Sequence, residues 1–220
     1  QNIAKYIIEN MGLIAHNSAQ ADVRKKSITT NARFHKDSNH FVKVDFTKFF
    51  PSITEDLLRE VLPQIGILAY TQYTRELTIQ RSFVNFVEAV IQLATLKGSL
   101  PQGTPISPLL SNLIMIPFDY HMIENLKKTP KPVIYTRYAD DSTFSSFYAF
   151  GDTKEIAKAN VDQLINDTIT ECYGKDRILI NPKKTTVSTK YGKNRITGIK
   201  VNGENKLSIG YKEKQQLKKN

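Results

Sequence analysis

The chain has 220 residues, of which 40% are hydrophobic and 24% charged, a globular composition that excludes a wholly disordered chain. Its longest apolar runs are too short to cross a bilayer, and its single cysteine, Cys172, excludes a disulfide framework and a multi-cysteine zinc site. The chain opens on Gln1 without a charged and apolar leader, so we expect a cytoplasmic protein, seen as a fragment, with no membrane partner.

The positive charge is concentrated near the end of the chain. The net charge is +10, and the residues from Asn181 onward include eleven basic and two acidic side chains. A one-sided basic segment is typical of a surface that binds a phosphate backbone. A solvated, lysine-rich tail would have the same composition, so charge alone leaves both interpretations open.

Apolar spacing and turn residues predict the elements of the first half of the chain. Ser52 and Glu55 form a capping-box pattern, from which a helix is expected to begin. In order, we expect a helix over 2–11, a basic turn at 24–27, a strand over 40–46, and helices over 52–62 and 75–96.

The second half mixes strands and helices without regular βαβ repeats. A second capping box, Asp152 to Glu155, predicts the start of a helix that ends near Cys172. The pattern favours an α+β fold with an antiparallel sheet over a doubly wound fold. The other expected elements are a Gly/Pro loop at 98–105, a helix over 107–127, a hairpin of 132–138 with 142–146, short strands near 178, 187, 196–201 and 207–209, and a basic helical end.

Three carboxylates fall at the ends of predicted strands. Asp45 ends the strand over 40–46, and Asp140 and Asp141 lie at the tip of the hairpin. Mg²⁺ prefers oxygen ligands, and two such ions about 4 Å apart activate an attacking hydroxyl and stabilise a leaving pyrophosphate. An Asp-Asp pair alone more often marks a solvated turn, so it is the partner acid Asp45 that favours a metal site.

Four segments occur in the order of motifs A to D of reverse transcriptases, and the chain resembles that family from about residue 41 to 185. Two further elements resemble the NAxxH and VTG elements of bacterial retron reverse transcriptases, with Ile196 in place of valine. The six segments are VDFTKFFPS (44–52), LPQGTPISP (100–108), YADD (138–141), NPKKT (181–185), NARFH (31–35) and ITG (196–198).

The resemblance implies an α+β, right-hand polymerase palm: an antiparallel sheet flanked by helices, with partial fingers. Partial fingers are expected over 1–40, the palm with inserted helices over 41–192, and a basic palm-to-thumb junction over 193–220. Further fingers sequence would precede the chain, and a thumb would follow it.

The resemblance also implies the roles of individual residues. Phe50 would lie against the sugar of the incoming nucleotide and exclude a 2′-hydroxyl, although core packing beside Phe49 is an open alternative. The expected metal ligands are Asp45, Asp140, Asp141 and the carbonyl of Phe46. The expected nucleotide contacts are Phe50, Gln102, Gly103, Lys184 and one or two of Arg24, Lys25 and Lys26.

RNA contacts are expected at the two retron-like elements and beside the second of them. For His35, a structural role is an equally open alternative. The expected RNA contacts are Asn31, His35, Lys193, Arg195, Thr197 and Gly198.

The implied reaction is RNA-directed DNA synthesis, in which two Mg²⁺ ions assist a primer hydroxyl to attack the α-phosphate of a dNTP. Retron-type priming would use the 2′-hydroxyl of an internal guanosine in a structured non-coding RNA and give a branched RNA–DNA hybrid, with a separate effector protein in antiphage defence. One alternative is a group II-like or other defence reverse transcriptase without retron priming. Another is an RNA-binding scaffold with a vestigial site, which is disfavoured because the motif A, B and C residues occur together.

Overall fold

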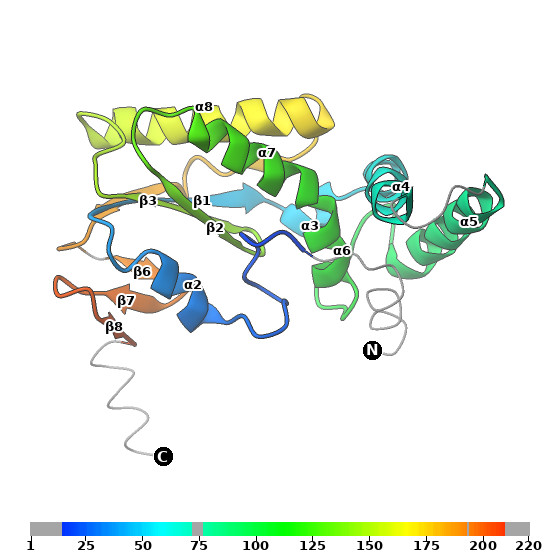
Figure 1. Ribbon diagram of the computed structural model, residues 1–220, viewed down its shortest axis with the longest axis horizontal. Helices are drawn as coiled ribbons and strands as arrows, with labels where there is room; N and C mark the ends of the chain where they lie inside the picture. The colour runs from blue at the N-terminus through cyan, green and yellow to red at the C-terminus, as the bar shows by residue number, and fades with distance from the viewer. Residues whose placement is uncertain (1–14, 72–76, 193, 210–220) are drawn as a thin grey trace, which may run out of the picture. The chain divides into compact units, whose positions relative to one another are not determined.

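The structure is a computed structural model that describes residues 15–71, 77–192 and 194–209. The helix expected over 2–11, the basic helical end and Lys193 lie outside the described residues. In chain order the elements are α2 (Ile28–Phe34), β1 (His40–Thr47), α3 (Phe49–Ser52), α4 (Glu55–Thr71), α5 (Leu77–Ala94), α6 (Ser107–Ile114), α7 (Ile116–Lys127), β2 (Ile134–Tyr138), β3 (Asp141–Ser146), α8 (Lys154–Tyr173), β4 (Leu179–Ile180), β5 (Thr186–Thr189), β6 (Arg195–Ile196), β7 (Ile199–Val201) and β8 (Leu207–Ser208) (Figure 1).

The chain divides into two compact units. One contains residues 47–120 and 169–179, and the other contains residues 17–46, 121–168 and those from 180 onward. Antiparallel strands combined with helices confirm the predicted α+β class. None of the described helices has both the length and the apolar character that a membrane crossing requires. The boundaries expected between fingers, palm and junction stay a prediction.

The larger sheet is built around β1. Its strand order is β2-β3-β1-β4, and β5 also pairs with β1. β3 runs antiparallel to both β1 and β2, so the hairpin predicted from 132–146 is confirmed. Successive side chains of a strand point to opposite faces, so Val42 and Val44 face one side of the sheet, and Phe41, Lys43 and Asp45 face the other.

Both faces of this sheet are covered within the same unit. Helix α8 lies along one face, whereas α2 and the small sheet β6-β7-β8 lie on the other (Figure 1). On the α2 side, Phe41 is fully buried in a cluster with Ala32, Ile196, Ile199 and Val201. Burial of these apolar side chains fixes the small sheet and α2 against the strand that carries Asp45.

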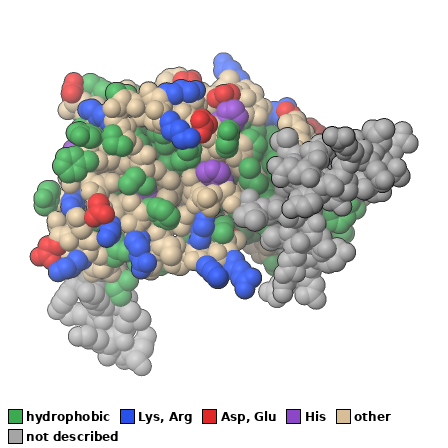
Figure 2. Space-filling view, in the orientation of Figure 1, with side chains coloured by type: hydrophobic (Ala, Val, Ile, Leu, Met, Phe, Trp, Pro, Cys, Tyr) green, Lys and Arg blue, Asp and Glu red, His purple; other side chains and the backbone are tan. Residues whose placement is uncertain are grey.

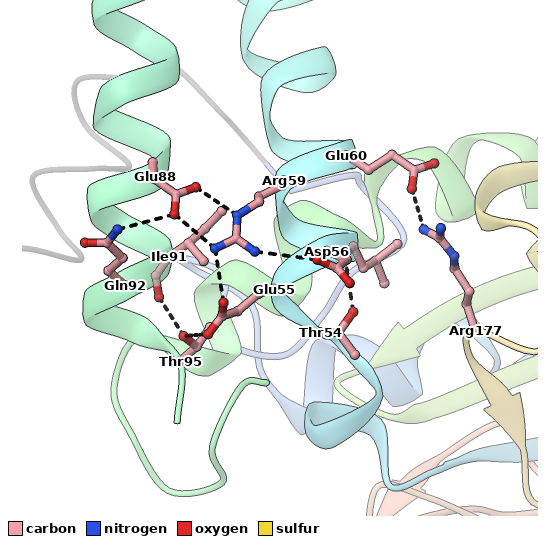
Figure 3. A network of polar contacts seen from close by, with 11 residues as sticks. Thr54, Glu55, Asp56, Arg59, Glu60, Glu88, Ile91, Gln92, Thr95 and Arg177 are labelled. Atoms are coloured by element: carbon pink, nitrogen blue, oxygen red, sulfur yellow. Dashed lines mark hydrogen bonds and ion pairs between the residues drawn. The ribbon is translucent and has the colours of Figure 1, made fainter. Parts of the chain in front are cut away.

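In the other unit, α4 and α5 are joined by polar contacts (Figure 3). Arg59 donates to both oxygens of Glu88, at 2.9 and 3.0 Å, and to Glu55 at 3.1 Å. The hydroxyl of Thr95 donates to the other oxygen of Glu55 at 2.8 Å. The hydrogen bond from Arg59 lowers the pKa of Glu88. These groups lie near the surface, so the contacts orient the two helices more than they stabilise them.

Two helix starts differ from the predicted capping boxes. The hydroxyl of Thr54 accepts an amide proton from the first turn of α4, while Ser52, the predicted cap, lies inside α3. Thr153 caps α8 in the same way, in place of Asp152. In both cases the residue directly before the helix supplies the capping oxygen, so the predicted caps were wrong by one or two positions.

The single helix expected over 107–127 is two helices. The break falls at Met115, because Pro117 has no N–H with which to bond the carbonyl of Leu113 four positions earlier. Helix α4, by contrast, continues past Pro63 and beyond the end predicted for it. A proline inside a helical pattern therefore ended one helix and not the other.

Candidate active site

The strand register brings the three predicted carboxylates together. Asp45 of β1 is directly opposite Asp141, the first residue of β3. Asp140 precedes it in the two-residue turn of the β2–β3 hairpin, and its carbonyl accepts the amide proton of Phe46 at 3.2 Å. Ala139, the other turn residue, has a φ of 55° and its carbonyl accepts a hydrogen bond from the buried Arg137 guanidinium at 3.2 Å. The sheet thus positions three acids at one point of two neighbouring strands.

Two of the three carboxylates, Asp140 and Asp141, have raised pKa values. The pKa of Asp140 is raised chiefly by burial and further by the charge of Asp45. The pKa of Asp141 is likewise raised by burial and then by the charges of Asp140 and Asp45. Because nearby like charges disfavour ionisation, the site gains stability from any cation that it binds.

Lys184 supplies such a positive charge. Its Nζ lies 3.0 Å from Oδ1 and 3.1 Å from Oδ2 of Asp45. The turn that carries Lys184 is attached to the same strand, because Asn181 donates its amide proton to the Asp45 carbonyl at 2.7 Å. The hydrogen bond to Asp45 raises the pKa of the lysine. The motif D-like turn and the motif A-like strand therefore meet, while the nucleotide contact expected of Lys184 stays a prediction.

The carboxylate oxygens of Asp45, Asp140 and Asp141 are donors of the kind that binds a hard divalent cation. Among the residues that the structure describes, no three His, Cys, Asp or Glu side chains are close enough to enclose a metal ion, and both oxygens of Asp45 face the Lys184 ammonium. The three side chains are nonetheless all carboxylates with partly buried, mutually repelling charges, and Asp45 already holds a cationic group with both oxygens. Such all-oxygen donors are the ligands that Mg²⁺ prefers.

Lys43 is a site residue that the sequence interpretation missed. Lys43 lies on the same face of β1 as Asp45. Its positive charge lowers the pKa of Asp141, and the negative charge of Asp141 acts to raise the pKa of Lys43. Burial lowers the pKa of Lys43, whose Nζ donates to the Arg195 carbonyl at 2.8 Å. The period of two along a strand would have placed Lys43 beside Asp45.

The basic turn at 24–27 divides into two kinds of residue. Arg24 and Lys25 are exposed in a turn, with Lys25 at a φ of 65°. The ammonium of Lys26 instead donates to the carbonyls of Asn17 and Ala19, both at 2.7 Å. Lys26 therefore fixes the chain before α2, whereas Arg24 and Lys25 are exposed, and the expected triphosphate contact of one or two of these residues stays a prediction.

The motif A ring and the motif B residues belong to the other unit. Phe50 is half-buried in α3, with its ring 5.5 Å from that of the buried Phe49. Gln102 and Gly103 are exposed in the loop before α6, where Gly103 has a φ of 83°. Their placement relative to the carboxylates stays a prediction.

The retron-like elements contact each other across the α2 side of the larger sheet. Asn31 and His35 are buried, at 1% and 0% exposed, so of the two roles left open for His35 the structural one is supported. Thr197 and Gly198 form the turn between β6 and β7, and Asn31 donates to the Thr197 hydroxyl. Arg195 is exposed beside this turn.

An antiparallel sheet flanked by helices, with acids on two adjacent central strands, is the fold of a polymerase palm. Over residues 1–211 the chain matches the family "Reverse transcriptase (RNA-dependent DNA polymerase)", and it belongs to that family. Members of the family use divalent metal ions.

The resemblance to retron reverse transcriptases is confirmed. The chain is 31% identical over 202 residues to the retron Ec83 reverse transcriptase of Escherichia coli, covering 92% of this chain and 60% of that protein. It is 30% identical over 207 residues to the retron Mx162 reverse transcriptase of Myxococcus xanthus, covering 92% and 42%. The chain thus spans about half the length of these curated relatives.

Solved structures agree with the fold. Apo telomerase from Candida tropicalis, truncated from its C-terminal domain, superposes with a TM-score of 0.62 at 12% identity, over 94% of this chain and 45% of that one. A second structure of apo telomerase from the same organism gives a TM-score of 0.57 at 11% identity, over 91% and 39%. At such identities the likeness supports the polymerase fold alone.

Proposed function

We propose that this chain is the catalytic core of an RNA-directed DNA polymerase that extends a primer hydroxyl with dNTPs on a structured non-coding RNA. The observation that carries the proposal is the register that sets Asp45 opposite Asp141, with Asp140 in the adjoining turn. The similarity to retron reverse transcriptases supports retron-type priming from an internal guanosine, a branched RNA–DNA product and an antiphage role with a separate effector protein.

The three carboxylates and the Phe46 carbonyl would hold two Mg²⁺ ions. When bound, the ions supply activation of the primer hydroxyl and stabilisation of the charge that develops on the leaving pyrophosphate. Asp45 and Asp140 would be the principal ligands, and Asp141 a further ligand or an orienting group. Lys43 and Lys184 would balance the carboxylate charge before the ions bind.

Other side chains would bind the nucleotide. Lys184 would exchange its contact with Asp45 for the triphosphate or donate a proton to the leaving pyrophosphate. Arg24 and Lys25 would contact the triphosphate from the fingers side. In the other unit, Phe50 would exclude a 2′-hydroxyl by size. Gln102 and Gly103 would approach the nucleotide and the template, because an amide hydrogen-bonds sugar or base and a glycine permits close backbone approach.

The test is nucleotide incorporation by the intact protein on its copurified RNA. Asp140→Asn should reduce incorporation by at least about a hundredfold, because a metal ligand of the transition state is lost while the side-chain shape is kept. The affinity for RNA should not change. Asp167→Asn, an exposed aspartate on α8, is the matched control and should extend primers as the wild type does. Incorporation by Asp140→Asn near the wild-type rate would show that the carboxylates are not the catalytic centre.

A further inference from the structure

The turn between β6 and β7 has an unusual conformation. Both of its residues have a positive φ, 45° at Thr197 and 86° at Gly198. Turns of this kind favour Asn, Asp or Gly, and a β-branched residue such as threonine rarely adopts them. A strained residue of this kind persists only where its surroundings over-determine it, and such residues are concentrated at functional sites.

A buried amide holds Thr197 in place. Asn31 Nδ2 donates to the threonine hydroxyl at 3.3 Å, across 166 positions of sequence. Asn31 is 1% exposed and lies on α2, whose start is fixed by a reciprocal capping box between Ser27 and Thr30. Glycine would adopt the turn conformation without strain but would offer Asn31 no acceptor, which accounts for a threonine at this position.

Asn31 is oriented in turn by hydrogen bonds of definite direction. Its Oδ1 accepts the only proton of the Thr136 hydroxyl at 2.6 Å, so Thr136 must accept from His35 Nε2 at 2.7 Å. The neutral His35 therefore has no proton on Nδ1, which accepts from the Ser145 hydroxyl at 2.7 Å. We call this the relay, and it runs from Ser145 through His35, Thr136 and Asn31 to Thr197.

Two positively charged residues flank the turn, one on each of its two strands. Arg195 and Lys200 are directly opposite in the β6–β7 register, and both are exposed. The Arg195 guanidinium donates to the carbonyl of Gly198 at 3.2 Å, so its position depends on the turn. Like charges directly opposite on paired strands destabilise the pair, and an anion bound between them would reverse that effect.

We propose that Asn31 and His35 are positioning residues for binding of the RNA phosphate backbone. Through Thr197 the relay sets the left-handed turn, and the turn sets the spacing of Arg195 and Lys200 for phosphate groups. Neither positioning residue contacts RNA itself, because both are buried. The inference rests on the proposed function, which supplies RNA as the ligand, and deepens it by naming the element that grips the backbone.

A double-mutant cycle in the intact protein tests the relay, with RNA affinity measured across a salt titration. Thr197→Val keeps the β-branched shape but removes the hydroxyl, and Asn31→Ala removes the amide. Each should weaken RNA binding by about fivefold, the effect of one hydrogen bond. Each should also make the fall of log K with log salt less steep by about 0.7, the value of one phosphate contact. The double variant should bind no more weakly than either single variant, because both remove the same link.

Two further variants separate positioning from general stability. Thr197→Ser keeps the hydroxyl that Thr197→Val removes, so this variant should bind RNA as the wild type does. Asn125→Ala removes a matched bond on the opposite side of the sheet, where Nδ2 donates to the Thr168 hydroxyl at 3.2 Å. It should lower the Tm without changing RNA affinity or the salt slope.

Two outcomes would overturn the positioning role. One is additive losses of affinity for Asn31→Ala and Thr197→Val. The other is an Asn31→Ala protein with a lower Tm that binds RNA as the wild type does. A wild-type protein that binds no RNA would overturn the proposed function together with this inference. That result differs from the two outcomes above, in which the wild type binds RNA.

Discussion

His35 is a buried imidazole, and its neutral form is the one that accepts the Ser145 proton at Nδ1. Burial lowers its pKa from 6.5 to about 3. Between these two values the unfolded chain binds a proton that the folded protein does not. Stability therefore falls as the pH drops below about 6.5, by about 1.4 kcal/mol per pH unit, and this loss levels off near the folded pKa.

Replacing His35 should remove this component of the pH dependence. Urea unfolding of His35→Gln between about pH 4.5 and 6.5 should show a slope smaller than that of the wild type by about 1.4 kcal/mol per unit. Ser38→Ala is the control, because it deletes the 2.8 Å bond to Ser145 at the far end of the network but keeps the imidazole. An equal slope in the wild type and His35→Gln would contradict the buried neutral state.

The acids of the site could be predicted from sequence, and the strand period could have added Lys43, whereas contacts between distant segments could not be predicted. Asp45 and Asp140 follow strand patterns that are local in the chain. The contact of Lys184 with Asp45 spans 139 positions, and the bond from Asn31 to Thr197 spans 166. These contacts depend on which distant segments pair with β1 and pack beside α2, and no local pattern encodes that.

At the level of elements, the strands were predicted more accurately than the helix ends. Alternation marks a half-buried strand along its whole length, so β1 and the β2–β3 hairpin fell where they were expected. A helix end depends on which of several adjacent polar residues reaches a free amide, as Ser52 and Thr54 illustrate. The pairing of β1 with β3, which creates the site, required knowledge of strand order.

The start of α8 offers a direct test of the observed cap. The Thr153 hydroxyl accepts the amide proton of Ile156 at 3.2 Å, and Asp152 is one position too early to do so. Thr153→Ala should therefore lower the free energy of unfolding by about 1 kcal/mol. Asp152→Ala should cost less, because it loses only the favourable interaction of a charge with the helix dipole. Equal losses in urea unfolding of the two variants would contradict the assignment of the cap.

At the scale of the whole chain, the basic residues that the structure describes after Asn181 have different surroundings. Of the basic residues that follow Asn181, Lys184 contacts Asp45, Lys190 is 8% exposed and Lys206 pairs with Glu204 at 2.9 Å. On the face in view, lysine and arginine side chains gather over α2 and the segment before it (Figure 2). The unit that contains the three carboxylates has several exposed cationic side chains, among them Arg24, Lys25, Arg33, Arg195 and Lys200.

The opposed pair Arg195 and Lys200 should account for a measurable part of the electrostatic binding of RNA. Each neutralised phosphate releases condensed counterion, so log K falls with log salt by roughly 0.7 to 0.9 per contact. Replacing both residues by Gln should therefore flatten the slope by about 1.5, and should weaken cognate and scrambled RNA alike. The variant loses the like-charge repulsion together with the Arg195 hydrogen bond to Gly198, so an unchanged Tm is the control that separates weaker binding from unfolding.

The double replacement of Lys127 and Lys128 by Gln is the matched control, since it removes the same charge from the end of α7 and should change the slope far less. Equal slopes for the wild type and the Arg195/Lys200 variant would mean that these cations form only a solvated surface. A lost preference for cognate RNA at an unchanged slope would instead assign sequence or shape recognition to the β6–β7 hairpin, because phosphate contacts position an RNA without specifying it.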